Sequence, residues 1–227
     1  ANVLGHEGVG VITEVGASVR NWSLGDAVVF NPVSPAQKDE ILGRSFDGLF
    51  QERFLVERAD WMDWLIHRIP KSLVKPIGAL IEPLATAIYS RDLAISQSDA
   101  RKAVVIGDGP IAMLNSIVLR LSGFESVLMI HGRSTRRSWA VNNGYFSQFD
   151  VISGRGNVVG NVLERLDGEF ADVAIICSPG ETVERATLDA FGYLKSSGLI
   201  NFVSNAVPAV ISLNSGDLNV RELQHRS

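Results

Sequence analysis

A glycine-rich turn between an apolar run and a helix-like segment is the part of this chain whose residue types and spacing best suit chemistry. The run 103–106 leads into Gly107-Asp108-Gly109-Pro110-Ile111-Ala112, which fits the pattern G-x-G-x-x-G/A. Gly107 would allow a tight turn, Gly109 would let a pyrophosphate approach the backbone, and the small Ala112 would let a helix lie close to the strand. The helix start would offer N–H groups and its positive dipole end to the phosphates. In this strand–turn–helix context the pattern predicts dinucleotide binding and hydride transfer.

Alternating apolar and helical segments from about residue 98 onward supply the scaffold that such a turn needs. Strands are predicted at 103–107, 126–131, 149–152, 172–177, 199–204 and 208–213. Helices are predicted near 110–122, 134–143, 158–167 and 181–194. This alternation is typical of an α/β protein with a parallel, doubly wound sheet.

Residues 1 to about 75 have a different, β-rich pattern. Strands are predicted within 8–15, at 26–30 and at Phe50–Val56, and residues 77–95 are predicted to be helical. The predicted domains are therefore a β-rich part at 1–76, a connecting helical segment at 77–97 and a dinucleotide-binding part at 98–227.

Composition narrows the class of protein. The chain has 227 residues, a net charge of -4 and an apolar fraction of 46%. This charge gives no general attraction to nucleic acid or to an anionic membrane surface. The apolar runs are short, so neither a transmembrane helix nor a signal peptide is expected. The single cysteine, Cys177, excludes an internal disulfide and a multi-cysteine zinc cage within this chain and fits a reducing, cytoplasmic setting.

Several further blocks resemble, in one order, those of the medium-chain dehydrogenase/reductase superfamily, which includes zinc alcohol and polyol dehydrogenases. They are Gly5-His6-Glu7, Val19 to Val28, Asp47 to Arg53, Glu82-Pro83-Leu84-Ala85, the turn 107–112, Ala140 with Gly144, and Arg221-Glu222-Leu223. The resemblance implies a GroES-like catalytic domain, here partial, followed by a Rossmann domain. It also implies that the chain is truncated at both ends, and that the whole protein is a homo-oligomer.

The same resemblance implies a catalytic zinc. His6 would be a ligand, Glu7 a ligand or a neighbour of the ligands, and Glu82 a ligand directly or through water. Zinc takes about three protein ligands and keeps a position open for the substrate oxygen. Family members carry a cysteine ligand before the Gly-His-Glu block, so zinc binding by this chain stays open, and an isolated Gly-His-Glu also suits a surface turn. A structural zinc is not expected, because no cysteine lies between Asp26 and Asp47.

The segment after the second strand of the dinucleotide-binding part favours NADP over NAD. NAD-binding units usually end this strand with an acid that binds the ribose hydroxyls, but here His131-Gly132-Arg133 follows. Arg133 can pair with a 2′-phosphate, Gly-Arg-Ser resembles the segment of NADP-dependent members, and Arg136 adds positive charge. The alternative is a solvated helix start that happens to be basic.

Three other residues complete the predicted cofactor contacts. They are Pro110, Ile111 and Ser178, which follows the fourth strand. Asp108 is unusual in a phosphate-binding turn, and we expect it either to point to solvent or to cap the following helix.

These features predict an NADP-preferring enzyme that interconverts a secondary alcohol, of polyol or sugar type, and a ketone with the help of zinc. One alternative is a zinc-free reductase of the same superfamily acting on a quinone or an activated double bond. Another is a catalytically inactive nucleotide-binding sensor or scaffold.

Overall fold

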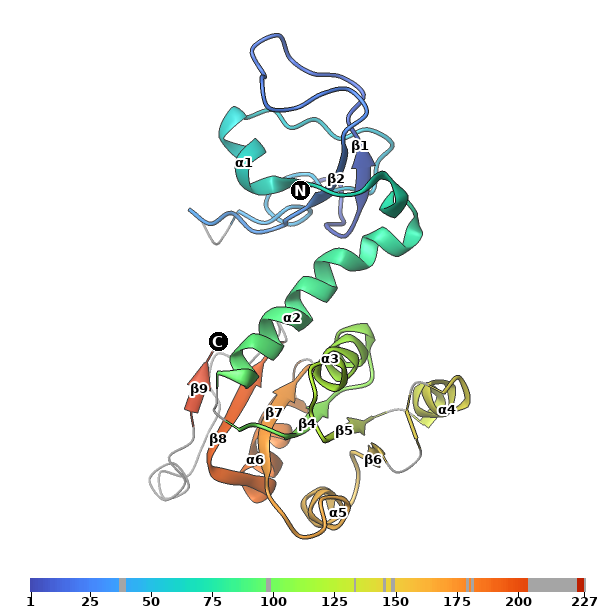
Figure 1. Ribbon diagram of the computed structural model, residues 1–227, viewed down its shortest axis with the longest axis vertical. Coiled ribbons are helices and arrows are strands. Elements are labelled where there is room, and N and C mark those ends of the chain that lie inside the picture. Colours follow the sequence, from blue (N-terminus) through green and yellow to red (C-terminus); the bar gives the residue numbers. More distant parts are fainter. Residues whose placement is uncertain are drawn as a thin grey trace. The chain divides into compact units, whose positions relative to one another are not determined.

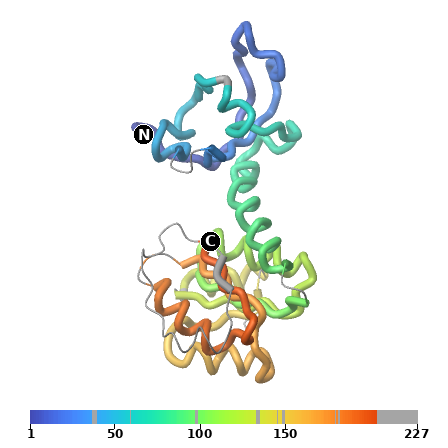
Figure 2. Tube along the Cα trace, turned by 90° about the vertical axis from the view of Figure 1, so that its left-hand side faces the viewer, coloured from blue at the N-terminus to red at the C-terminus, as the bar shows by residue number. Residues whose placement is uncertain are grey.

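The chain divides into two compact units, and each is described by itself. The first unit comprises Ala1–Ala85 and the second Thr86–Ser227; both can be followed in the computed structural model (Figure 1, Figure 2). The structure describes residues 1–36, 40–96, 99–132, 134–144, 146–147, 150–178, 180, 182–203 and 224–226. In this part of the chain, no helix has both the length and the apolar character needed to cross a membrane.

A small antiparallel sheet forms the centre of the first unit. β2 (Ala27–Phe30) lies between β1 (Val9–Val11) and β3 (Ile66–Arg68). The β-branched residues of β2 suit a pleated, half-buried surface, and Val28 is buried together with Leu42 in a core of aliphatic and aromatic side chains. The strands predicted at 8–15 and 26–30 are thus present, although the first is shorter than predicted.

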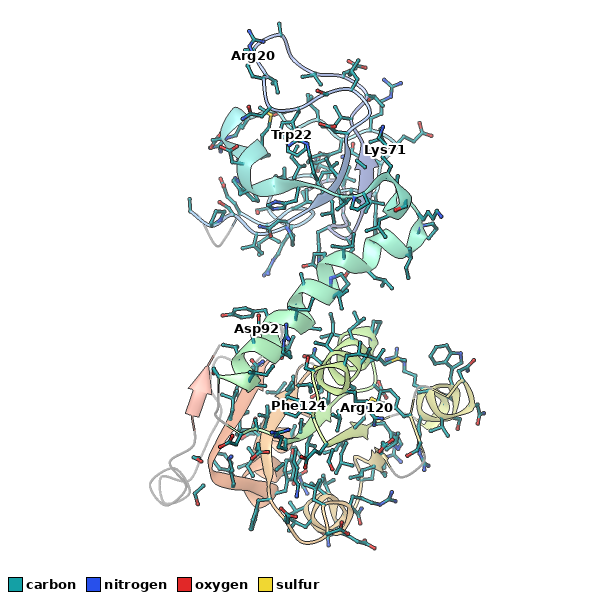
Figure 3. The ribbon with its side chains drawn as sticks, viewed as in Figure 1. Arg20, Trp22, Lys71, Asp92, Arg120 and Phe124 are labelled. Carbon is teal, nitrogen blue, oxygen red and sulfur yellow. The ribbon has the colours of Figure 1, made fainter. Side chains whose placement is uncertain are left out.

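Short helical elements follow in the same unit. They are η1 (Ala59–Trp61), α1 (Met62–Leu65), η2 (Lys71–Leu73) and η3 (Pro76–Leu80). Aromatic contacts hold this region, since the ring centroids of Phe46 and Trp61 are 4.4 Å apart. The guanidinium of Arg68 lies 4.2 Å from the ring centroid of Trp22, a residue labelled in Figure 3.

The strand predicted at Phe50–Val56 is wrong. The N–H groups of Leu49 and Phe50 donate to the carbonyls of Gly5 and Leu4, but Gln51 then donates back to Leu49 at 2.7 Å, and this turn ends the pairing. Beyond it, Phe54 and Val56 pack into the core of the unit while the residues between and around them stay exposed. The alternation therefore reflects packing of an extended segment without a strand ladder in the described residues.

Helix α2 (Ile81–Ile95) follows η3 directly, and the boundary between the two units falls inside it, after Ala85. The helical segment predicted at 77–95 is confirmed, with its first turns tightened into the 3₁₀ conformation. In the second unit α2 is held to the sheet by a buried polar contact, in which Nδ2 of Asn201 donates to Oγ of Ser90 at 2.7 Å.

A six-stranded sheet organises the second unit. Every neighbouring pair in it is parallel, and the order is β6-β5-β4-β7-β8-β9, which Figure 1 shows from right to left. The strands are β4 (Lys102–Ile106), β5 (Ser126–His131), β6 (Val151–Ser153), β7 (Ala171–Ile176), β8 (Leu194–Phe202) and β9 (Gln224–Arg226). Numbered along the chain, this is the 3-2-1-4-5-6 order of dinucleotide-binding folds.

Helices cover both faces of this sheet. They are α3 (Pro110–Leu121), α4 (Ser134–Asn142), α5 (Val158–Arg165) and α6 (Thr182–Tyr193). Val104 and Ile106 of β4 belong to the core formed with α5 and α6, whereas Ala103 and Val105 belong to the core formed with α2 and α3. Alternate residues of a strand point to opposite faces, so the predicted doubly wound architecture is confirmed.

The strand boundaries differ from prediction chiefly at the last strands. β8 begins at Leu194, because Ala171 pairs with Leu194 and Val173 with Leu199, which leaves a bulge at 195–198. The polar residues of this bulge hid the start of the strand in the sequence. The strand predicted at 208–213 lies outside the described residues, and the sixth strand that the structure describes is β9.

Two residues labelled in Figure 3 secure the junction of α3 and β5. Arg120 donates through Nη2 to the carbonyl of Val127 at 3.1 Å and pairs with Asp150, just before β6, at 3.0 Å. Phe124 is buried between α3 and β5. These contacts fix the outer strands against the strand that precedes the glycine turn.

Asp172 at the start of β7 joins three segments of the second unit. Its Oδ2 accepts hydrogen bonds from the backbone N–H groups of Arg101 and Lys102 at 2.7 and 2.8 Å, and its Oδ1 pairs with Nζ of Lys195 at 2.6 Å. Burial acts to raise the pKa of Asp172, but the hydrogen bonds from these three residues outweigh it and hold the pKa below its ordinary value.

We expect Asp172→Asn to lower the free energy of unfolding by about 1–3 kcal/mol at neutral pH, because the amide cannot accept from all three donors. A lowered folded-state pKa stabilises the protein fully above the unfolded-state pKa of about 4, and this stabilisation disappears as the pH falls through the folded value. The free energies of unfolding of the variant and the wild type, measured in urea, should therefore converge as the pH falls into the acid range. The exposed Glu184→Gln serves as control, and equal stability of Asp172→Asn and wild type at neutral pH would contradict the assignment.

Candidate functional site

Three side chains in the first unit lie close enough to share a metal ion. His6 and Glu7 come from the segment before β1, and Glu82 is the second residue of α2. Each offers one ligand atom, an imidazole nitrogen or a carboxylate oxygen, and these atoms all lie within 4.8 Å of one another. The structure thus brings together residues that are far apart in the sequence, and it places them in one compact unit.

Glycines at close contacts bring the His6 segment into position. Gly5 has φ +94°, and a side chain on Gly48 would collide with the carbonyl oxygen of Gly5. The N–H of Gly48 donates to the carbonyl of Val3 at 2.8 Å, and Oδ1 of Asp47 accepts from the N–H of Asn2 at 2.6 Å. The N–H groups of Asn2 and Val3 both donate to Oδ1 of Asp47 and hold its pKa below the ordinary value.

Gly78 in η3 allows a second close contact, which brings the start of α2 near β1. A side chain there would collide with the carbonyl of Leu73 and would lie 2.9 Å from Cγ1 of Val9 in β1. Because η3 leads into α2, this contact sets the start of α2 against the strand that follows His6 and Glu7. Gly48 and Gly78 were not predicted as part of the site, and the signal that points to them is only the presence of glycine next to Asp47 and before Glu82.

The electrostatics of the cluster favour a bound cation. Burial raises the pKa of Glu82; the charge of His6 opposes the rise and the charge of Glu7 adds to it. Two carboxylates at such short range repel each other, and a divalent cation would relieve this repulsion. One imidazole nitrogen and two carboxylate oxygens are ligands that zinc accepts, so the residues present fit that metal.

The glycine turn of the second unit has the predicted tight geometry. Gly107 has φ +137°, and a Cβ there would lie 3.3 Å from Cβ of Ala112 and from Cβ of Cys177. Its N–H donates to the carbonyl of Ile130 at 2.8 Å. The position therefore needs glycine both for its backbone conformation and for the close approach of α3 and β7 to the end of β4.

The start of α3 suits an anion. Gly109 is the residue before the helix and Pro110 is its first residue, so the N-cap position itself carries no side chain. The N–H groups of Ile111 and Ala112 lie in the first turn, at the positive end of the helix dipole, where a phosphate would be attracted.

The structure contradicts the expectation that Asp108 points to solvent. Its Oδ1 pairs with Nη1 of Arg136 in α4 at 3.1 Å, and its side chain is 16% exposed. This pair could not be predicted from the sequence, because the two residues lie 28 positions apart. Several arginines stand near the start of α4, and the sequence does not indicate which of them contacts the glycine turn.

The remaining predicted cofactor residues lie around the same end of the sheet. His131 ends β5, is 7% exposed, and accepts through its carbonyl from the N–H of Gly154. Gly132 is exposed and next to Asp108, whereas Arg133 lies outside the described residues. Ser178 follows β7, and its buried Oγ has no hydrogen-bond partner in the described part of the chain. A buried hydroxyl without a partner fits a surface that a ligand completes.

Two residues beside the turn were not predicted as part of the site. Asn115 is fully buried in α3; its Nδ2 donates to the carbonyl of Ile111 at 2.9 Å and lies 3.9 Å from Sγ of Cys177. Burial raises the pKa of Cys177 to about 12, so its thiol stays protonated and serves packing. A single amide within the apolar stretch 111–119 is the signal that could have drawn attention to Asn115.

Comparison with known proteins relates the chain to dehydrogenases. Residues 1–70 match the family of alcohol dehydrogenase GroES-like domains. Sorbitol dehydrogenase of Rattus norvegicus is 29% identical over 236 residues, which cover 97% of this chain and 63% of that protein. D-xylulose reductase of Saccharomyces cerevisiae is 30% identical over 209 residues, which cover 82% and 56%. The predicted resemblance is thereby confirmed.

A solved structure agrees in fold. The crystal structure of 2R,3R-butanediol dehydrogenase from Bacillus subtilis superposes with a TM-score of 0.74 at 26% identity, and the match covers 98% of this chain and 64% of that one. The predicted fold class, a GroES-like part with a Rossmann-like part, is confirmed. The chain spans less than two thirds of the length of each of these three proteins.

We expect Gly107→Ala to destabilise the second unit by about 1–3 kcal/mol, because a side chain there is strained at positive φ and meets neighbours at 3.3 Å. Gly156→Ala is a matched control, since Gly156 has φ +79° with nothing within 4 Å of its Cβ position. Thermal unfolding should therefore show a larger loss for Gly107→Ala. An equal loss would mean that the close approach of α3 and β7 does not require glycine.

We expect the purified chain to bind one zinc ion and His6→Ala to weaken that binding by about tenfold or more, because a nitrogen ligand is lost. Competition with a chromogenic chelator measures both affinities. His67→Ala is the control, since His67 is exposed and contacts the carbonyl of Trp64. Equal zinc affinity of wild type and His6→Ala would contradict the proposed ligand set.

Proposed function

We propose, from the premise that the chain belongs to the medium-chain, zinc-type dehydrogenases, that it forms part of an NADP-preferring oxidoreductase. The reaction is the interconversion of a secondary alcohol, of polyol or sugar type, and a ketone. The observation that carries the proposal is the convergence of His6, Glu7 and Glu82, whose ligand atoms lie within 4.8 Å of one another. The glycine turn of the second unit supplies the matching cofactor site.

The metal site consists of His6, Glu7 and Glu82. In this proposal His6 gives a nitrogen ligand, and Glu7 and Glu82 give carboxylates, of which Glu7 acts as a ligand or beside the ligands and Glu82 directly or through water. When bound, zinc polarises the alcohol or ketone oxygen and lowers the pKa of the hydroxyl. The half-buried Glu82 and the exposed Glu7 together offset the charge of the cation, while the backbone bonds of the Gly48 segment hold His6 in place.

The cofactor site consists of residues at the carboxyl ends of β4, β5 and β7. Gly107, Gly109, Pro110 and Ile111 receive the pyrophosphate at the start of α3. Residues His131, Gly132, Arg133 and Arg136 receive the 2′-phosphate, and Ser178 contributes its buried hydroxyl. A bound nicotinamide dinucleotide takes up or gives the hydride.

The substrate class follows from the ligand set and from the relatives. The ligand set of two carboxylates and one imidazole differs from the cysteine-rich metal site of other zinc alcohol dehydrogenases. The similar proteins are a sorbitol dehydrogenase, a D-xylulose reductase and a butanediol dehydrogenase. All three names denote compounds with several hydroxyl or carbonyl groups. A small polyol or keto sugar is therefore the substrate that we propose.

The wider organisation remains part of the proposal. Residues 1–76 are assigned to a GroES-like catalytic domain, 77–97 to a connecting segment and 98–227 to the nucleotide-binding domain. We also propose that the whole protein is cytoplasmic and homo-oligomeric.

We expect the zinc-loaded protein to oxidise one or more of sorbitol, xylitol and 2R,3R-butanediol with NADP⁺, followed by nicotinamide absorbance. Glu82→Gln should lower turnover by about a hundredfold or more, because it removes a charged ligand from the metal. The exposed Glu57→Gln should leave turnover unchanged. Dinucleotide binding without turnover of any polyol or ketone would contradict the proposal and favour a nucleotide-binding sensor or scaffold.

A further inference from the structure

The carboxylate of Asp108 lies in a turn that should receive a pyrophosphate, and its own charge opposes that role. The structure compensates the charge through Arg136, whose Nη1 lies 3.1 Å from Oδ1 of Asp108. The two side chains differ in exposure, since that of Asp108 is 16% exposed and that of Arg136 is 48% exposed. Asp108 is therefore the more buried partner of the pair, and Arg136 is the partner with more solvent around it.

The pair joins the two turns that a dinucleotide would contact. Nη1 of Arg136 lies 3.8 Å from the position of a Cβ on Gly109, and Oδ2 of Asp108 lies 3.9 Å from the position of a Cβ on Gly132. These turns follow β4 and β5, which pair directly as parallel neighbours up to Ile106 and Ile130. The ion pair thus lies where the phosphate turn meets the end of the second strand.

This placement matters because the end of β5 lacks the acid that NAD-binding units use for the ribose hydroxyls. The residue at that point, His131, is only 7% exposed. The carboxylate next to Gly132 comes instead from Asp108 in the neighbouring turn. A carboxylate is thereby restored to this end of the sheet from a different strand.

We propose that Asp108 and Arg136 form a cofactor-selecting pair. The proposal rests on the proposed function of the site as a dinucleotide-binding turn. With a non-phosphorylated dinucleotide, Asp108 accepts hydrogen bonds from the ribose hydroxyls and stays paired with Arg136. With a 2′-phosphorylated dinucleotide, Arg136 turns to the phosphate, while the carboxylate of Asp108 repels that phosphate and limits the preference.

The pair therefore gives the site a restrained NADP preference and leaves it able to accept NAD. Removing the carboxylate should sharpen the preference, since Arg136 is then released and the repulsion disappears. Removing the guanidinium should reverse it, since the 2′-phosphate loses its cationic partner while the repulsion from Asp108 stays. These opposite effects distinguish a selecting pair from an ion pair that serves only stability.

The test is direct binding of NADPH and NADH, measured by calorimetry on the 227-residue chain. For Asp108→Asn we expect the ratio of the NADH to the NADPH dissociation constant to rise by about tenfold, which corresponds to about 1.4 kcal/mol. For Arg136→Gln we expect the ratio to fall by about tenfold. Asp108→Ser serves as a second variant should the asparagine protein fail to fold.

Asp189→Asn is the matched control. Asp189 also belongs to the second unit, pairs with Arg185 at 2.9 Å and has a side-chain exposure of 16%, equal to that of Asp108. For this control the ratio of the NADH to the NADPH dissociation constant should equal that of wild type. If wild type binds both dinucleotides and neither Asp108 variant changes the ratio, the selecting pair is overturned while the proposed cofactor site stands. If wild type binds neither dinucleotide, both proposals are overturned.

Discussion

The short distances among His6, Glu7 and Glu82 are the constraint on which the first unit depends. Their ligand atoms lie within 4.8 Å of one another, so two carboxylates are held at a range where their charges repel. The fold tolerates this only because Gly48 lets the His6 segment lie against the chain and Gly78 lets η3 lie against β1. Backbone packing thus assembles a charged cluster that side-chain interactions alone would disperse, which is typical of a site built for a ligand.

In the second unit, close packing and opposed charges likewise meet at the glycine turn. Gly107 allows the close packing of α3 and β7 on the end of β4, and the start of α3 has the positive end of a helix dipole, which attracts anions. Asp108 works against that attraction, and Arg136 balances it at 3.1 Å. The unit therefore combines a turn of the phosphate-binding type with a local charge pair, and in our proposal the balance between them sets the preference for one dinucleotide over the other.

The sequence predicts the parts of this structure that local pattern determines. The parallel strands are continuous apolar runs, so β4, β5 and β7 could be predicted within a residue or two, and Gly107 to Ala112 could be placed at a strand–helix junction. Contacts between distant segments could not: Arg136 reaches Asp108 across 28 residues, and the bulge at 195–198 forms where Lys195 meets Asp172. Phe54 and Val56 alternate like a strand but pack without a ladder, because the turn at Gln51 ends the pairing. His6 and Glu82 could be grouped beforehand only through resemblance to a family.

The account stands on the claim that the His6 cluster holds the metal. X-ray absorption at the zinc edge of the zinc-loaded chain tests it most directly, because nitrogen and oxygen ligands at about 2.0–2.2 Å are distinguished from sulfur at about 2.3 Å. We predict a shell of nitrogen and oxygen only, with the multiple-scattering signature of a single imidazole. A sulfur shell, which would have to come from Cys177 in the other unit, or a shell without imidazole would contradict the account.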